Sequence, residues 1–516
     1  MRRATDILCA MVNDRGLLTR LNLEERRKLL YAAGRVSRPD RDEERRLRRA
    51  FKKDHSSKRL AADRKTKSSA GIRTAREAAV FVAPTQITLP APTTQPHAEQ
   101  ELHSPRHCYV CKQDFTRLHF FYDALCPACA EFNYAKRFQS APLHGWVALI
   151  TGSRLKIGYQ AALKMLRAGA HVIATTRFPH DAAQRYAREP DFADWRTRLE
   201  IHGLDLRHSP SVEIFTRFLN ATHKRLDILI NNAAQTVRRP VGFYRHLLDF
   251  ENLPCRDLPS ELQALLSSHE QCKAALAAPD SRASPEPRTL VSGRDIDSTG
   301  LSVLGNASAS GAGAGIRDSA ALSQVRYTYD DLQSGRDVFP AGKTDADLQQ
   351  LDLRAHNSWR MTLAEVPTPE MLEVQLVNAV APFILCGKLK PLMLKHPTGQ
   401  RHIVNVTAME GIFSRGTKTD KHPHTNMAKA ALNMMTLTSA PDYARDGIFM
   451  NAVDTGWVTD EDPAAHAARK QREHDFQPPL DIVDGAARIC DPFFSGLLSG
   501  HHAWGKFLKD YKPANW

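Results

Sequence analysis

Long apolar runs are missing from this chain of 516 residues, since no uninterrupted hydrophobic stretch approaches the ~20 residues of a membrane helix. This absence argues against an integral membrane protein, and we expect no membrane partner. The first residues also lack the charged, apolar and small-residue succession of a secretory signal. Cysteine is scarce and odd in number, with nine residues, four of them in CxxC pairs. Such usage argues against a disulfide framework and for a reducing, intracellular compartment, with the cytoplasm favoured and the mitochondrion left open.

Acidic residues are few in the first 80 residues, which contain 11 Asp and Glu but 23 Lys and Arg. The remaining residues are nearly balanced, with 46 Asp and Glu and 48 Lys and Arg. The excess positive charge therefore belongs to one arm. Leucines recur there at loosely helical spacing, which predicts one or two polar helices with i,i+4 ion pairs. Three interpretations stay open: a solvated helical extension, a contact with nucleic acid or another anionic surface, and a mitochondrial presequence, against which Asp6 and Asp14 argue.

The chain divides into four regions. Residues 1–80 form the basic helical extension, 81–102 a Pro- and Thr-rich linker, 103–140 a cysteine-rich module and 144–516 the main domain. In the main domain β-branched runs alternate with amphipathic stretches, which predicts an α/β fold with a doubly wound parallel sheet. The predicted strands are residues 147–151, 171–176, 199–205, 226–230, 402–406 and 448–453.

The alternation is interrupted once, at about residues 241–370. The middle of this stretch, residues 281–323, is rich in Ser, Gly and Ala, a composition that predicts disorder. We interpret residues 241–370 as a long, partly disordered insertion into a surface connection, where added length costs little closure entropy.

Two CxxC pairs lie fourteen residues apart in the cysteine-rich module. Each CxxC turn can aim two thiolates at one point, and two such turns complete a tetrahedral shell for Zn²⁺. With four ligands and no open position the zinc would be structural, and it would supply folding energy to a small zinc-ribbon-like module. The alternative, two disulfides, needs an oxidising compartment. The predicted metal ligands are Cys108, Cys111, Cys126 and Cys129.

The segment 147–158 is typical of a buried strand followed by a glycine-containing turn and a helix. Such a turn presents backbone N–H groups and a helix N-terminus to a pyrophosphate. The second strand ends in Thr176 and Arg177, and an Arg there suits the 2′-phosphate of NADP, whereas an acid would suit the ribose of NAD. Asp205 ends the third strand, and residues 231–234 (NNAA) end the fourth.

These motifs resemble those of the short-chain dehydrogenase/reductase (SDR) superfamily over about residues 145–240 and 371–516. The resemblance implies a Rossmann fold, a nicotinamide cofactor (NADP or NAD), hydride transfer to or from a carbonyl or alcohol substrate, and a homo-oligomer as one possible assembly. Lys156 replaces a family glycine, which either crowds the cofactor or, with Arg154, adds charge that favours NADP. The cofactor-binding residues implied are Thr151, Gly152, Arg154, Lys156, Ile157, Gly158, Arg177, Asp205, Leu206, Asn232, Ala233, Ala234, Lys429, Thr455 and Gly456.

Two of the four catalytic groups of the family are missing. Lys429 and Asn378 match the family's Lys and Asn, but Thr425 stands at the position of the proton-donating Tyr and Ala408 at that of the Ser. An aliphatic hydroxyl cannot replace a phenol, because its pKa lies far above neutrality and its reach is shorter. A histidine would be a competent acid at neutral pH. The candidate substitutes are His424, His422 and Thr407.

The sequence therefore supports two functions. The first is an NADP-preferring SDR-type oxidoreductase with a non-standard proton donor, whose predicted catalytic residues are Lys429, Asn378, Thr425 and His424. The second is a catalytically impaired nucleotide-binding pseudo-enzyme that acts as a scaffold or sensor, tethered through the basic arm and the cysteine-rich module to a macromolecule such as RNA.

Overall fold

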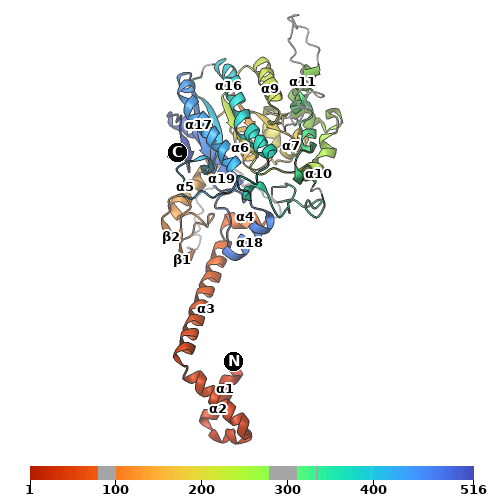
Figure 1. Cartoon of the computed structure of the whole chain (residues 1–516). Helices are drawn as coiled ribbons and strands as arrows, with labels where there is room; N and C mark the ends of the chain where they lie inside the picture. The colour runs from red at the N-terminus through yellow and green to blue at the C-terminus, as the bar shows by residue number, and fades with distance from the viewer. Residues whose placement is uncertain (79–99, 278–310, 333–334, 346, 397) are drawn as a thin grey trace, which may run out of the picture. The chain divides into compact units, whose positions relative to one another are not determined.

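The computed structural model describes residues 1–78, 100–277, 311–332, 335–345, 347–396 and 398–516 (Figure 1). They divide into two units. The first comprises residues 1–67 with 102–105, and the second comprises residues 68–101 with 106–516. The predicted linker, residues 81–102, lies almost wholly outside the described residues.

The first unit is helical, as the periodicity of the basic arm predicted. Its helix α2 begins with a capping box between Asn22 and Glu25, which satisfies two backbone N–H groups at the helix start. Among the described residues of this unit no hydrophobic side chain of α1 to α3 is buried, so the helices carry no core of their own. The elements are α1 (Arg2–Asn13), the 3₁₀ turn η1 (Arg15–Arg20), α2 (Leu23–Ser37) and α3 (Arg41–Ser68).

The predicted boundary of the extension at residue 80 was wrong. The short helix α4 (Gly71–Glu77) belongs to the second unit. Its Ile72 is fully buried in an apolar cluster with the cysteine-rich module, and the backbone N–H groups of Gly71 and Ile72 donate to the carbonyls of Phe120 and Phe121 at 2.9 Å. The extension therefore ends at about residue 67.

The cysteine-rich module is a β-hairpin followed by a helix. Strands β1 (Glu101–His107) and β2 (Asp114–Arg117) pair antiparallel, and α5 (Pro127–Phe138) follows. One CxxC pair lies at the hairpin turn, and the other begins at the N-cap of α5.

The main sheet has eight strands in the order β10-β9-β8-β7-β6-β3-β4-β5, all parallel except β10. Leu149 of β3 pairs with Ile173 of β4 on one side and with Leu229 of β6 on the other, so the strand order reverses at β3. Near-continuous apolar runs form these strands because both faces are covered by helices. The strands are β3 (Val147–Thr151), β4 (His171–Thr176), β5 (Leu199–Gly203), β6 (Ile228–Asn231), β7 (Arg401–Thr407), β8 (Ile448–Asp454), β9 (Phe507–Lys509) and β10 (Lys512–Pro513).

Helices pack on both faces of this sheet and bury two apolar clusters, which confirms the doubly wound α/β prediction (Figure 1). One face is covered by α6 (Lys156–Arg167), α7 (Pro179–Ala187), α8 (Phe192–Trp195), α11 (Ser260–Ala277) and α19 (Ile482–Ser499). The other is covered by α9 (Ser209–Thr222), α14 (Ala314–Arg317), α16 (Ala381–Leu394) and α17 (Pro423–Arg445).

Further elements connect these layers. They are α10 (Val241–Glu251), α15 (Thr368–Gln375), the π-helical turn η7 (Leu376–Val380), α18 (Ala464–His474) and the 3₁₀ turns η2 (Arg196–Arg198), η3 (Cys255–Asp257), η4 (Ala321–Gln324), η5 (Tyr329–Leu332), η6 (Ser358–Arg360) and η8 (Met409–Gly411).

The insertion is folded where the structure describes it. Residues 278–310 lie outside the described residues, but the prediction of disorder was wrong for residues 311–323. Ile316 is buried in the core, and the carbonyl of Gly315 accepts a hydrogen bond from the backbone N–H of Asp205 at 2.8 Å. A β-carbon on Gly315 would lie 2.9 Å from the His208 side chain, so the small residues that suggested disorder permit close packing instead.

Among the described residues one segment, Thr368–Leu394, is long and apolar enough to cross a membrane by length and composition alone. It comprises α15, η7 and α16. Half of its most apolar window is buried inside the structure, where Leu385 and Leu389 pack in the same cluster as Phe215 of α9. The segment supplies core residues to the main domain.

Candidate functional site

A cleft of about 430 Å³ lies at the carboxyl ends of the strands where the strand order reverses, which is the usual ligand position in open parallel sheets. Two of the predicted cofactor residues, Thr151 and Gly456, lie outside the lining, but Thr151 supports the wall of the cleft. Thr151 Oγ1 accepts hydrogen bonds from the backbone N–H groups of Asn232 and Ala233 at 3.1 and 3.0 Å. The predicted cofactor residues that line the cleft are Gly152, Arg154, Lys156, Ile157, Gly158, Arg177, Asp205, Leu206, Asn232, Ala233, Ala234, Lys429 and Thr455.

The turn between β3 and α6 has the close packing that a phosphate cradle needs. Gly152 has φ of +67°, and a β-carbon there would lie 2.8 Å from the Ala233 Cα. A β-carbon on Gly158 would lie 2.3 Å from the Gly152 carbonyl oxygen. The N-cap residue of α6, Leu155, provides no side-chain hydrogen bond, so the first N–H groups of this helix face the cleft uncapped. The turn fits the pyrophosphate of a dinucleotide.

Lys156 has a backbone φ of +54°, in the left-handed region that favours glycine. Its side chain lines the cleft and makes no salt bridge among the described residues. Burial raises the pKa of the Glu461 carboxyl across the cleft, but the Lys156 and Arg239 charges outweigh burial and hold that pKa below its ordinary value. Lys156 thus contributes positive charge to the cleft. Its left-handed backbone conformation is strained, because any residue other than glycine is disfavoured there.

Two arginines that line the cleft, Arg154 after β3 and Arg177 after β4, differ in their ion pairing. Arg154 is buried and forms a 2.6 Å ion pair with Asp181, so its charge is neutralised. Arg177, at the end of β4, donates to the Tyr244 hydroxyl at 2.7 Å and stacks over that ring, with 4.7 Å from the guanidinium carbon to the ring centroid. Within the described chain Arg177 makes no salt bridge. Of these two arginines, Arg177 therefore has the guanidinium that can bind a phosphate group of a ligand.

Asp205 is held by Arg207, a residue that the sequence analysis missed. The Arg207 guanidinium donates to both carboxylate oxygens of Asp205, at 2.6 Å for the shortest bond, and to Glu373 at 2.5 Å. Burial raises the pKa of Asp205, but the Arg207 charge outweighs burial and lowers it overall. The i,i+2 spacing of the two residues is the only sequence signal for this pair.

Lys429 lines the cleft together with Thr407 and Ala408. Its ammonium group donates to the Val406 carbonyl at 2.8 Å. Burial lowers the pKa of Lys429 to about 8, against a smaller opposing effect of Glu410. The Thr407 hydroxyl donates to the Lys429 carbonyl at 3.4 Å. Thr407, the last residue of β7, lines the cleft beside Ala408.

The structure argues against His424 as the proton donor. Neither His424 nor Thr425 lines the cleft. Burial lowers the pKa of His424 to about 4, so at pH 7 the ring is a neutral imidazole and not the imidazolium that acts as an acid. Thr425 donates instead to the Thr236 carbonyl at 3.4 Å. His422 stacks on the Trp359 ring at 3.9 Å and likewise lies outside the lining.

Asn378 lies in the π-helical turn η7, a local distortion often found at functional sites. Its side chain closes a two-bond clamp on the backbone of Gln235, accepting from the N–H at 2.7 Å and donating to the carbonyl at 3.0 Å. Asn378 therefore positions the segment after β6 that forms one wall of the cleft.

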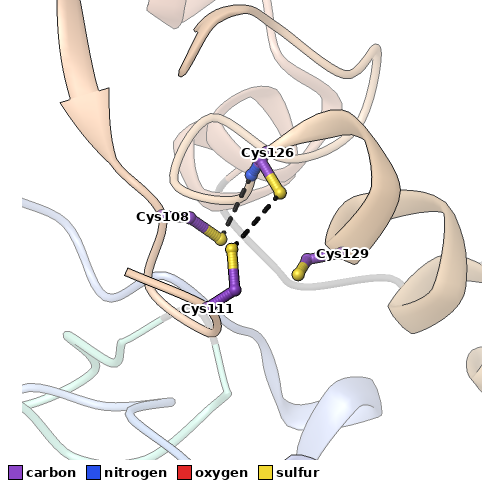
Figure 2. Close-up of side chains that lie close together, drawn as sticks. All are labelled: Cys108, Cys111, Cys126 and Cys129. Atoms are coloured by element: carbon purple, nitrogen blue, oxygen red, sulfur yellow. Dashed lines mark hydrogen bonds between the residues drawn. The ribbon is translucent and has the colours of Figure 1, made fainter. Parts of the chain in front are cut away.

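The four predicted metal ligands converge on one point. Their sulfur atoms all lie within 4.8 Å of one another, and the sulfurs of Cys111 and Cys126 are 3.7 Å apart (Figure 2). A tetrahedral shell with Zn–S bonds of ~2.3 Å has sulfur–sulfur edges of about 3.8 Å. The arrangement therefore fits Zn²⁺ with four thiolates.

Backbone N–H groups donate to two of the four sulfurs, those of Cys108 and Cys111. The backbone N–H of Cys126 donates to the Cys108 sulfur at 3.3 Å (Figure 2). A backbone hydrogen bond from Gln113 lowers the pKa of Cys111 to about 7, whereas burial raises the pKa of Cys126 and of Cys129.

A second group of metal-type ligands, which the sequence analysis missed, lies at the start of β4 and β5. Glu200 is 2.7 Å from the Nε2 of His171 and 3.5 Å from that of His223. These strands begin at the sheet edge opposite the cleft, so this cluster takes no part in the site.

Comparison with known sequences matches the two parts of the main domain separately. The family profile "short chain dehydrogenase" matches residues 146–250, and the profile "Enoyl-(Acyl carrier protein) reductase" matches residues 342–478. The unmatched stretch between them falls within the insertion. These two matches support assigning the main domain to the SDR superfamily of oxidoreductases.

Individual relatives match this chain over regions of different length. "Uncharacterized protein R665" of Acanthamoeba polyphaga mimivirus is 28% identical over 417 residues, covering 79% of this chain and 75% of that protein. Mouse retinol dehydrogenase 11 is 33% identical over 91 residues, covering 18% of this chain and 28% of its own length.

Solved structures with a similar arrangement include the RhlG/NADP complex of Pseudomonas aeruginosa, with 15% identity, a TM-score of 0.40, and coverage of 71% of this chain and 95% of the other. The angucycline ketoreductase LanV with bound NADP has 15% identity and a TM-score of 0.41, covering 72% and 96%.

Proposed function

We propose that the cleft binds NADP(H) and that the chain is an NADP-dependent oxidoreductase acting on a carbonyl or alcohol. The observation that carries the proposal is Arg177, whose guanidinium lies at the end of β4 without a salt bridge among the described residues. The uncapped start of α6 and the charge of Lys156 support binding of the remaining phosphates.

The chemistry at the other end of the cleft depends on Lys429. A bound nicotinamide would supply or accept the hydride. With a pKa of about 8, the Lys429 ammonium carries a proton at neutral pH and can release it. We propose that Lys429 Nζ gives this proton to the oxygen of a carbonyl as it becomes an alcohol, and regains one from solvent. Thr407, beside it, is the hydroxyl available to orient the carbonyl oxygen.

A nucleotide-binding pseudo-enzyme is the second candidate. Ala408 and Thr425 favour it, because no phenol and no serine hydroxyl stand where the family places them, and Thr425 lies outside the cleft lining and donates to the Thr236 carbonyl. In this function NADP(H) binding would be retained without turnover.

Turnover separates the two candidates. NADPH oxidation should be followed across a panel of aldehydes and ketones for the wild type, for Lys429→Met and for the exposed control Lys388→Met on α16. The oxidoreductase proposal expects turnover that falls at least about a hundredfold in Lys429→Met, since general acids contribute ~10²–10⁴-fold, and that is unchanged in the control. NADPH binding without oxidation of any substrate would favour the pseudo-enzyme.

We also propose that Cys108, Cys111, Cys126 and Cys129 bind one structural Zn²⁺. Support comes from the convergence of the four sulfurs and from the donors that stabilise thiolates. Metal analysis of purified protein tests this: Cys126→Ser should lose one equivalent of zinc, whereas Cys9→Ser, at an exposed cysteine of α1, should retain it. Unchanged zinc content in Cys126→Ser would contradict the proposal.

A further inference from the structure

The loop that follows β8 forms one wall of the cleft. We define the post-β8 loop as residues 455–480, which include α18. Thr455, Thr459 and Glu461 of this loop line the cleft. Glu461 accepts hydrogen bonds from Thr459 at 2.8 Å and from Thr236 at 3.3 Å, which joins the loop to the segment after β6.

The cysteine-rich module contacts the start of this loop through a residue between two metal ligands. Tyr109, in the turn between Cys108 and Cys111, accepts a hydrogen bond at its hydroxyl from the backbone N–H of Trp457 at 2.9 Å. A β-carbon on Gly456 would lie 3.3 Å from the same hydroxyl. The orientation of Tyr109 therefore depends on the turn that two metal-binding cysteines define.

Contacts from the module and from α4 also fix the far end of the loop. Arg73 of α4 forms buried ion pairs with Asp123 of the module at 2.6 Å and with Asp475 of the loop at 2.7 Å. Arg76 donates to the Leu480 carbonyl at 2.6 Å. An apolar cluster spans the module and both ends of the loop, and its buried members include Cys108, Phe115, Leu125, Val458 and Leu480.

We propose that the cysteine-rich module, folded by its metal, positions the post-β8 loop over the cleft, and that release of the metal frees the loop. This inference rests on the proposed function, since the loop matters only if the cleft binds a substrate. The physical reason is that so small a module depends on its metal for folding, and the loop depends on the module for anchors at both ends. Tyr109 is a positioning residue in this scheme, because it touches the loop and not the cleft.

Limited proteolysis of the full chain tests the coupling without requiring activity. Trypsin can cut after Arg469, Lys470 and Arg472 of α18 once that helix opens, and mass spectrometry reports each cut. After zinc removal by a chelator, or in Cys126→Ser, we expect cleavage at these sites to become about tenfold faster or more, because opening populations govern such rates. Unchanged cleavage in protein shown to have lost zinc would overturn the inference.

A second variant keeps the test decisive if loss of zinc unfolds the whole chain. Tyr109→Phe removes the hydroxyl that accepts from Trp457 while leaving all four cysteines, and we expect cleavage at α18 to become about threefold faster, as for one lost hydrogen bond. Tyr134→Phe is the matched control, since it removes a hydroxyl from α5 of the same module. Equal cleavage rates in the two variants would contradict the proposed coupling.

NADPH affinity separates a failure of this inference from a failure of the proposed function. In Tyr109→Phe the NADPH dissociation constant should stay within about twofold of the wild-type value, because the phosphate cradle lies on the β3–α6 turn. Absence of NADPH binding in the wild type would contradict the proposed function, whereas the cleavage rates would still report on the coupling of module and loop.

Discussion

The side-chain amide nitrogen of Asn232 lies 2.3 Å from the place where a β-carbon on Gly158 would stand. The same amide donates to the carbonyls of Thr151 and Gly152 at 3.0 and 3.1 Å, so it is held from two sides and cannot retreat. The first turn of α6 and the end of β6 therefore meet at a single point, and that contact shapes the phosphate side of the cleft.

Gly158→Ala should break this contact. The added methyl would overlap both the Asn232 amide and the Gly152 carbonyl, and backbone atoms cannot move aside as a flexible side chain can. We expect a loss of about 1–3 kcal/mol in the free energy of unfolding, together with weaker NADPH binding. Urea denaturation and NADPH titration measure the two effects.

Gly387→Ala is the matched control, because a β-carbon on this glycine of α16 meets nothing within 4 Å. There the substitution should stabilise the protein by about 0.5–1 kcal/mol through helix propensity. Equal stability changes in the two variants would contradict the close-packing interpretation.

The elements with strong local signals could be predicted from the sequence. The bounds of β3 and β4 were predicted to the residue, and the other main strands within two residues, because buried parallel strands are continuous apolar runs. The cysteine cluster was also predictable, since paired CxxC spacing constrains four sulfurs locally.

The parts that depend on distant contacts could not be predicted. Tyr109 and Trp457 are 348 residues apart in the sequence, and no local sequence pattern predicts their hydrogen bond. His424 was predicted as an acid because it is adjacent in sequence to Thr425, the family's Tyr position. Sequence position does not reveal that the ring is buried, and burial keeps it neutral at pH 7. The folded residues 311–323 were missed because small residues signal disorder and tight packing alike.

Lys156→Gly should stabilise the fold while weakening cofactor binding. A left-handed backbone costs a residue with a side chain about 1 kcal/mol, and glycine removes that strain. We expect the free energy of unfolding to rise by about 1 kcal/mol relative to Lys156→Ala, which loses the charge but keeps the strain. Both variants should bind NADPH about tenfold more weakly than the wild type or worse, since charge-assisted contacts contribute ~1.5–3 kcal/mol. Equal thermal stability of Lys156→Gly and Lys156→Ala would contradict the proposed backbone strain.

The burial of Lys429 predicts a pH-dependent stability. Its pKa is lowered to about 8 from an ordinary value of 10.5, so between these pH values the unfolded chain binds more protons than the folded chain. The free energy of unfolding should therefore rise with pH in this window, by up to about 3 kcal/mol, relative to Lys429→Met. Urea denaturation of both proteins at pH 7, 8, 9 and 10 gives the difference. Parallel pH profiles of the two proteins would contradict the lowered pKa.

We propose that the basic N-terminal unit binds a polyanion such as RNA. Deletion of residues 1–67 should abolish binding of the chain to single-stranded RNA, and binding of the intact chain should weaken steeply with salt as counterions are released. Fluorescence anisotropy at rising KCl concentrations measures both. Binding that survives the deletion, or that does not respond to salt, would contradict this role.

The most direct test of the whole account is a titration of the purified full chain with NADPH and NADH, for the wild type and for Arg177→Ala. We expect the wild type to bind NADPH about tenfold more tightly than NADH, because a guanidinium–phosphate contact contributes ~1.5–3 kcal/mol. In Arg177→Ala this preference should vanish while NADH binding is retained. If the wild type binds neither coenzyme, the cleft is not a nicotinamide site; if the preference survives in Arg177→Ala, the assignment of the phosphate to Arg177 is wrong.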